Sequence, residues 1–286
     1  MSSTDSSEQG IDAAELETAF KLIHRFTTRA TAVAGQEWED GRAPESTPAI
    51  VVGDGIASRS TPLAGRLPWV QEVRNYVELE IAGIEIRQFS YLREHRHYDG
   101  RQTTIRASDA GERLPVYLPK NSASTCLLAF SWACPIFLLR LVDWLTTEDR
   151  GRIPCLVLLQ PAFAISPLVS SAWRQYPQYS LSVGLAEALD PDRSVSFHAQ
   201  LIAALERIQL AIPVHLRYWA DDRFLAYPPA LIRRIEDAGV DVDTVEGIAF
   251  PLRCETHFNA TATFPETAGF CVLSRLSWRG APLAKL

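Results

Sequence analysis

The sequence predicts an α/β protein in which helices flank a mostly parallel central sheet, and three observations lead to this prediction. From about residue 48 onward, short apolar stretches of strand character alternate with stretches of helical periodicity. Residues 153–159 are almost continuously apolar, which is typical of a parallel strand covered on both faces. Residues 124–130 lead through one serine directly into a long apolar helix. The 286 residues, 47% of them hydrophobic, suffice for a sizeable core.

Four segments are expected along the chain. Residues 1–46 hold a disordered start and an accessory helix over 12–34. Residues 47–163 form the first part of the α/β core, and residues 212–286 form the second part. Between them, residues 164–211 contain helical and aromatic patterns without a strong strand candidate, so they predict an inserted helical cap.

Each core element has a local signal. Helices are expected over 62–82, directly after Ser131, and between Pro228-Pro229 and Gly239, because proline favours the first turn of a helix and glycine its end. The strands are bounded by glycine, proline and polar residues. The expected strands, in chain order, are residues 49–52, 84–91, 124–130, 153–159, 212–219 and 240–248.

Composition excludes several classes of function. The formal net charge is -6 and no basic stripe is visible, which argues against nucleic-acid binding. The polar start MSSTDSSEQG has no apolar leader core, and no apolar run reaches the length of about 18 residues that spans a membrane. The cysteines are odd in number and scattered, as expected of buried thiols in a reducing compartment. We therefore expect a cytoplasmic protein that acts on a small molecule or peptide.

The most informative motif is Ala129-Phe-Ser131-Trp-Ala133, which lies at the predicted junction of strand and helix. In a nucleophile elbow, usually Gly-x-Ser-x-Gly, a serine occupies a sharp turn that lifts its hydroxyl above the sheet. Small flanking residues allow the helix to approach the strand, and alanine is the smallest side chain after glycine. The motif therefore makes Ser131 a candidate nucleophile.

A serine nucleophile needs a base and a carboxylate that orients the base, and this chain supplies both in order. Asp221 and Asp222 follow the strand predicted over 212–219, and His257 follows the last predicted strand. With this order and the strand-helix alternation, the chain resembles the α/β-hydrolase fold family from about residue 48 to its end.

The resemblance implies roles for particular residues. Asp222-Arg-Phe-Leu fits the family's acid turn better than Asp221, which remains the alternative acid. His257 would be the base, and the backbone amides of Trp132 and Ile56 would form the oxyanion hole. The family usually has His-Gly before the second of these amides, whereas this chain has Asp54-Gly55.

The resemblance also implies hydrolysis or acyl transfer on an ester, thioester or amide, without a metal or an organic cofactor. The aromatic residues of the cap and of the elbow favour a bulky, partly apolar substrate. The alternative is a non-hydrolytic enzyme of specialised metabolism, such as an epimerase, cyclase or lyase with His257 as base, or a non-catalytic ligand-binding protein. The residues expected to contact the substrate are Phe130, Trp173, Tyr176 and Tyr179.

Two other motifs carry less weight. His95-Arg-His97-Tyr-Asp99 resembles the metal motif of metallo-β-lactamases, but the next residue is glycine instead of a further histidine. Gly53-Asp-Gly55-Ile-Ala-Ser58 approaches a dinucleotide fingerprint, but its third glycine is missing. We therefore expect no metal and no dinucleotide.

Overall fold

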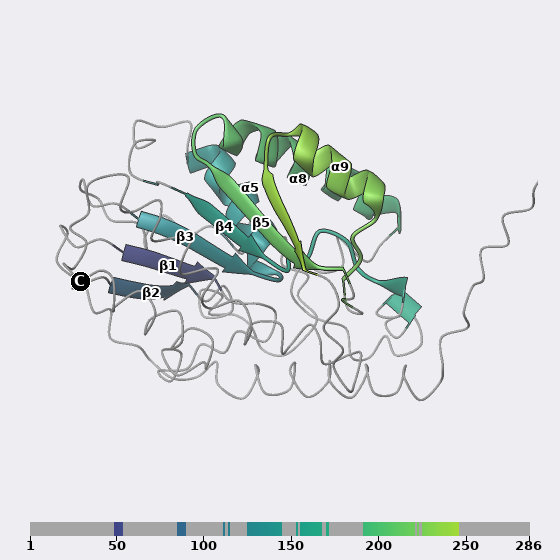
Figure 1. Ribbon diagram of the computed structural model, residues 1–286, viewed down its shortest axis with the longest axis horizontal. Coiled ribbons are helices and arrows are strands. Elements are labelled where there is room, and N and C mark those ends of the chain that lie inside the picture. The colour runs from purple at the N-terminus through teal and green to yellow at the C-terminus, as the bar shows by residue number, and fades with distance from the viewer. Residues whose placement is uncertain are drawn as a thin grey trace, which may run out of the picture.

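The central sheet is parallel throughout the part of the chain that this computed structural model describes (Figure 1). Its strand order is β2-β1-β3-β4-β5-β6. The strands are β1 (Ala49–Gly53), β2 (Glu85–Phe89), β3 (Thr125–Phe130), β4 (Leu156–Leu159), β5 (Val214–Trp219) and β6 (Asp241–Val245). The described residues are 49–53, 85–89, 111, 114, 125–144, 153, 155–167, 170–171, 191–220, 222 and 225–245. The predicted α/β class with a mostly parallel sheet is confirmed.

The burial of each strand follows from its composition. β1, β3 and β4 read AIVVG, TCLLAF and LVLL and are buried along their whole length, as apolar strands at the centre of a parallel sheet should be. β6 reads DVDTV and has its aspartates exposed at the sheet edge. There Asp241 lies 2.8 Å from His215 Nδ1, and Asp243 lies 3.3 Å from Arg217 Nε. These cross-strand pairs match the register of β5 with β6.

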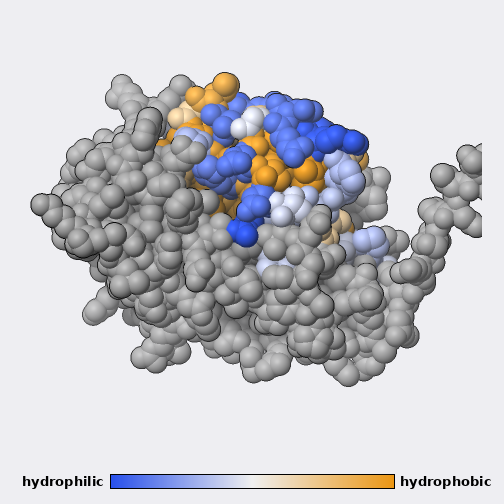
Figure 2. Space-filling model, viewed as in Figure 1, coloured by the Kyte–Doolittle hydropathy of each residue, from blue (hydrophilic) through white to orange (hydrophobic). Residues whose placement is uncertain are grey.

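Among the described residues, three helices cover one face of this sheet: α5 (Ala133–Trp144), α8 (Pro191–Gln209) and α9 (Pro229–Asp237) (Figure 1). α9 begins at the predicted prolines, and Gly239 follows it with φ 83°, a conformation that glycine adopts without strain. Leu231, Ile232 and Ile235 face the core, while hydrophilic residues gather on the outside (Figure 2). Amphipathic packing therefore holds α9 on the sheet.

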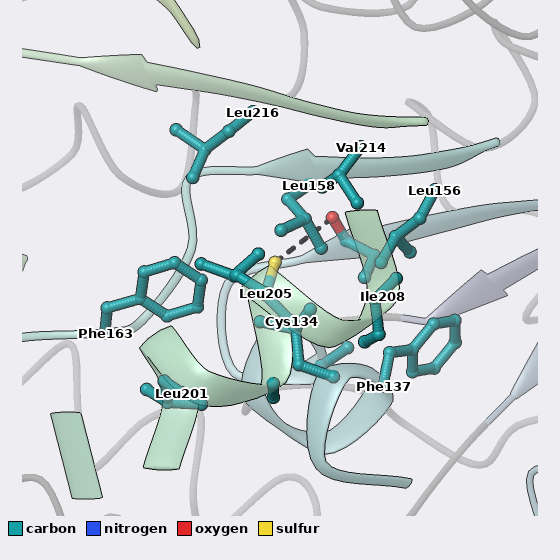
Figure 3. Close-up of a cluster of buried hydrophobic side chains, with 14 of the residues drawn as sticks. Cys134, Phe137, Leu156, Leu158, Phe163, Leu201, Leu205, Ile208, Val214 and Leu216 are labelled. Carbon is teal, nitrogen blue, oxygen red and sulfur yellow. Dashed lines mark hydrogen bonds between the residues drawn. The ribbon is translucent and has the colours of Figure 1, made fainter. Parts of the chain in front are cut away.

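α8 differs from the expectation for residues 164–211, which was a helical cap. It connects β4 to β5 and packs against α5 and the sheet, with Phe197, Leu201, Leu205 and Ile208 in the core. Figure 3 shows the last three among other buried side chains. Parallel strands need such a crossover, and a helix is the usual one. Residues 191–209 thus belong to the α/β core, whereas 172–190 lie outside the described residues.

Strand order reverses direction at β1, because the chain runs from β1 to β2 on one side and then to β3 on the other. In open α/β sheets, ligands bind beyond the carboxyl ends of the strands at such a switch point. Ser131 follows β3 at that edge, beside the end of β1 at Gly53. The topology therefore directs attention to this edge.

Candidate active site

The turn between β3 and α5 has the conformation of a strained elbow. Ser131 has φ 53°, in the left-handed region that residues other than glycine seldom adopt. The residue is 4% exposed. A left-handed residue between a strand and a helix bends the chain sharply, and such outliers occur at functional sites. The structure thus places the predicted nucleophile at a strained strand-to-helix turn.

Small residues allow α5 to lie close to the sheet behind this turn. A Cβ atom added to Gly53 would lie 2.5 Å from Cε1 of Phe137 and 2.9 Å from Cβ of Ala133. Such distances leave no room for a side chain at position 53. Ala133 therefore performs the packing role that the usual motif gives to glycine.

The Ser131 backbone is held on both sides. Its N–H donates to the Leu159 carbonyl at 2.9 Å, and its carbonyl accepts from the N–H groups of Cys134 and Ala162, each at 3.1 Å. The Cys134 thiol donates to the Ala129 carbonyl at 3.3 Å. Burial raises the pKa of this thiol well above its ordinary value, so it remains neutral and unreactive. Cys134 therefore stabilises the turn through its bond to the Ala129 carbonyl.

Trp132 directly follows the candidate nucleophile at the start of α5. Its backbone amide is the first oxyanion donor that the sequence predicts. Its ring was expected to favour a bulky substrate, but it is only 1% exposed and stacks on Phe197 of α8, with ring centroids 6.0 Å apart. The ring thus joins the elbow to α8. Phe130, the predicted substrate contact, is the last residue of β3 and is 7% exposed.

Asp222, the favoured candidate acid, lies just beyond β5 and is 7% exposed. Its backbone N–H donates to the Trp219 carbonyl at 3.3 Å, and Oδ1 accepts from the N–H of Leu225 at 3.1 Å. An aspartate that bonds the backbone a few residues ahead stabilises a turn. Oδ2 accepts from Nε2 of Gln160 at 2.5 Å. Both carboxylate oxygens are therefore held by N–H donors.

Gln160 is a site residue that the sequence reasoning missed. It follows β4, is fully buried and has φ 46°. Its backbone N–H donates to the Arg217 carbonyl at 2.9 Å, and its side-chain carbonyl accepts from the Trp219 N–H at 2.5 Å. One available signal was a polar residue placed directly after an apolar strand, at the edge where Ser131 and Asp222 were expected.

Tyr227 completes the polar contacts around the β4 exit. Its hydroxyl donates to the Pro161 carbonyl at 3.2 Å, and its ring lies 4.5 Å from that of Tyr218, centroid to centroid. Burial raises the pKa of this phenol well above its ordinary value, and the negative charge of Asp222 adds to the effect. Tyr227 is therefore a neutral hydrogen-bond donor beside the candidate acid.

The structure places Ser131, Gln160 and Asp222 one to three residues beyond the carboxyl ends of β3, β4 and β5. These neighbouring ends form one edge of the sheet. The other predicted site residues lie outside the described ranges: Asp221, His257, Ile56, Trp173, Tyr176 and Tyr179, together with His95, His97 and Asp99.

Within the described ranges, no group of three or more His, Cys, Asp or Glu side chains is arranged to hold a metal ion. Those same residues contain no helix that is long and apolar enough to span a membrane.

Comparisons with solved structures identify the fold. A fungal esterase from Rhizomucor miehei superposes with a TM-score of 0.52 at 12% identity, over 94% of this chain and 97% of that one. Est1E from Butyrivibrio proteoclasticus gives a TM-score of 0.51 at 12% identity, over 82% of this chain and 90% of that one. No protein-family model and no curated protein matches the sequence. The chain has the α/β-hydrolase fold, as its resemblance implied.

Proposed function

We propose that this protein is a serine-dependent hydrolase or acyl transferase. Its substrate is an ester, thioester or amide of a bulky, partly apolar small molecule or peptide. The observation that carries this proposal is the left-handed backbone of Ser131 between β3 and α5, at the carboxyl edge of an α/β-hydrolase sheet. Strain of this kind persists only where the surroundings enforce it, and here it supports a serine presented to a substrate above the sheet.

In this mechanism, Oγ of Ser131 attacks the substrate carbonyl while His257 accepts its proton. His257 then returns the proton to the leaving group, and water or another acceptor resolves the acyl-enzyme. Asp222 orients His257 and stabilises its cation. The backbone amides of Trp132 and Ile56 donate to the developing oxyanion.

Two features of the described residues support these roles. The start of α5 directs peptide dipoles toward Ser131, which favours developing negative charge. The Asp222 carboxylate is held by Leu225 and Gln160, so its orientation is fixed before any substrate arrives. The cytoplasm remains the proposed compartment, and the support for it is the buried thiols of Cys134 and Cys155, which form no disulfide.

A fluorophosphonate probe tests the nucleophile directly, because it phosphonylates only an activated serine. We expect the wild type to be labelled and Ser131→Ala to lose labelling entirely. Ser196→Ala is the matched control, since Ser196 lies on the exposed face of α8. An unlabelled wild type, or a labelled Ser131→Ala variant, would contradict the serine mechanism.

A second comparison separates nucleophilic catalysis from base catalysis alone. In the proposed mechanism, Ser131→Ala and His257→Ala each lower turnover of an aryl ester by roughly 10⁴ or more. An epimerase, cyclase or lyase needs the imidazole but not the hydroxyl. Full turnover of the natural substrate by Ser131→Ala, with loss in His257→Ala, would therefore replace the hydrolase with one of these enzymes.

A further inference from the structure

We propose that Gln160 is a positioning residue that fixes the carboxylate of Asp222 for catalysis, an inference that rests on the proposed function. Gln160 lies 62 positions before Asp222 in the chain, yet Nε2 of its amide is 2.5 Å from Oδ2 of the carboxylate. Neither residue is more than 7% exposed. A charge-assisted hydrogen bond in such surroundings is stronger than a neutral one in water.

The amide can point in only one direction. The N–H of Trp219 needs an acceptor, and Oε1 of Gln160 provides it at 2.5 Å. The NH₂ end must then face Asp222, because the two ends of the amide are opposite in hydrogen-bonding character. Exchange of the two ends would place donor against donor at Trp219 and acceptor against acceptor at Asp222.

The backbone of Gln160 is also fixed in an unfavourable conformation. With φ 46° it is left-handed, although it carries a long side chain and is not glycine. Its N–H bonds to the Arg217 carbonyl, and the next carbonyl, of Pro161, accepts from Tyr227. Because several contacts enforce one strained arrangement, the arrangement is expected to serve a function.

The same segment reaches the candidate nucleophile. Ala162, two residues after Gln160, donates its N–H to the Ser131 carbonyl at 3.1 Å. The exit of β4 therefore holds Asp222 through a side chain and Ser131 through the backbone. Gln160 thereby fixes the acid relative to the elbow without contacting the substrate.

Gln160→Glu is the decisive substitution, because glutamate has the same shape and can donate only when protonated. When protonated, the introduced carboxyl accepts from Trp219 through one oxygen and donates to Asp222 through the other. When ionised, it places two carboxylates in contact, and such pairs share one proton until the pH is well above an ordinary carboxyl pKa. Tyr227 is the described titratable group whose pKa the charge of Asp222 affects, and its phenol stays neutral throughout because burial raises its pKa.

We would measure the second-order rate constant of fluorophosphonate labelling between about pH 6 and pH 9. At each pH, the rate constant of the variant is divided by that of the wild type. This ratio cancels the titration of the catalytic base. For Gln160→Glu we expect it to fall by about tenfold or more across the range as the shared proton is lost. Gln160→Met, of similar length but without a donor, should lower the rate about tenfold at every pH. Gln200→Glu, the same change on the exposed face of α8, should give a ratio near one throughout.

Urea unfolding of the same variants checks that the pair forms. In the folded variant, the pair of Asp222 and the introduced carboxyl keeps its shared proton to a higher pH than the unfolded chain does. The unfolding free energy of Gln160→Glu should therefore fall, relative to wild type, as pH rises from about 4 until this proton is lost. A pH-independent labelling ratio near one for Gln160→Glu, or wild-type rates for Gln160→Met, would overturn the positioning role. An unlabelled wild type would contradict the serine mechanism itself. The pH dependence of the unfolding free energy would then show only that residue 160 contacts Asp222.

Discussion

Ser131 and Gln160 lie next to each other, one residue beyond the paired ends of β3 and β4, and both have left-handed backbones, with φ values of 53° and 46°. The N–H of Ser131 donates to Leu159, the residue just before Gln160. Two strained residues other than glycine on adjacent strands each cost stability. Both lie at the carboxyl edge of the sheet, which is the edge where open α/β sheets bind their ligands.

Backbone strain at Ser131 can be measured by comparing two variants that both lack the hydroxyl. Ser131→Gly should be more stable than Ser131→Ala by about 1 kcal/mol, because glycine adopts positive φ without a Cβ clash. Urea unfolding monitored by circular dichroism gives the difference. As a control, Ala199→Gly in the exposed face of α8 should destabilise by about 1 kcal/mol. Equal stability of the two Ser131 variants would mean that the turn carries no strain.

The choice of acid is tested with Asp222→Asn and Asp221→Asn. In Asp222→Asn the new NH₂ must face a donor, either Gln160 or the Leu225 N–H, because both oxygens are already used as acceptors. We expect a loss of about 1–3 kcal/mol in the unfolding free energy, and a fall of roughly 10⁴ in esterase turnover. Asp221→Asn should change neither quantity greatly. The reverse pattern would make Asp221 the acid.

The close packing of α5 on β1 predicts the effect of enlarging Gly53. Gly53→Ala should destabilise the protein by about 1–3 kcal/mol, because the added methyl overlaps the ring of buried Phe137. Phe137→Leu shortens that side chain, so the double variant should lose less than the sum of the two single changes. A double-mutant cycle from urea unfolding measures this coupling. Strict additivity would show that the ring does not limit position 53.

Alkaline pH should reveal the partly buried phenol of Tyr227. Its pKa is raised in the folded state, so its contribution is fully present below about pH 10 and is lost as pH rises through the folded value. Tyr227→Phe lacks this titration, and near neutral pH it should be less stable by about 1 kcal/mol because the Pro161 carbonyl loses its donor. The two unfolding curves should therefore converge above about pH 10. A constant difference in unfolding free energy up to high pH would show that folding does not raise the pKa of Tyr227.

The sequence predicted those parts of the fold whose causes are local. β3, the elbow and α5 are continuous in the chain, so an apolar run, a serine between small residues and a second apolar run were enough to indicate them. α9 was predicted from its prolines and Gly239 for the same reason. The parallel sheet also followed the expectation for α/β proteins, because helices supply the crossovers that parallel strands need.

The parts that the sequence did not predict depend on contacts between distant segments. In α8, apolar residues recur at helical spacing: Phe197, Leu201, Leu205 and Ile208. This spacing predicts an apolar helix face, but it does not indicate whether that face packs on the sheet or belongs to a cap. Gln160 bonds with Asp222 across 62 positions, and nothing near it in the chain marks this partner. The position of Trp132 beside the serine suggested that its ring contacts the substrate, but the ring packs on Phe197 of α8.

The assignment of α8 to the core has a consequence for protein engineering. A graft that replaced the whole of residues 164–211 as one module would remove the hydrophobic face of α8, which packs against Trp132 and α5. The turn at Ser131 would thereby lose the packing that supports it. An exchange that begins after Ser171 and stops before Pro191 retains the whole of α8. Segment swaps in this part of the chain should therefore retain α8 as part of the recipient scaffold.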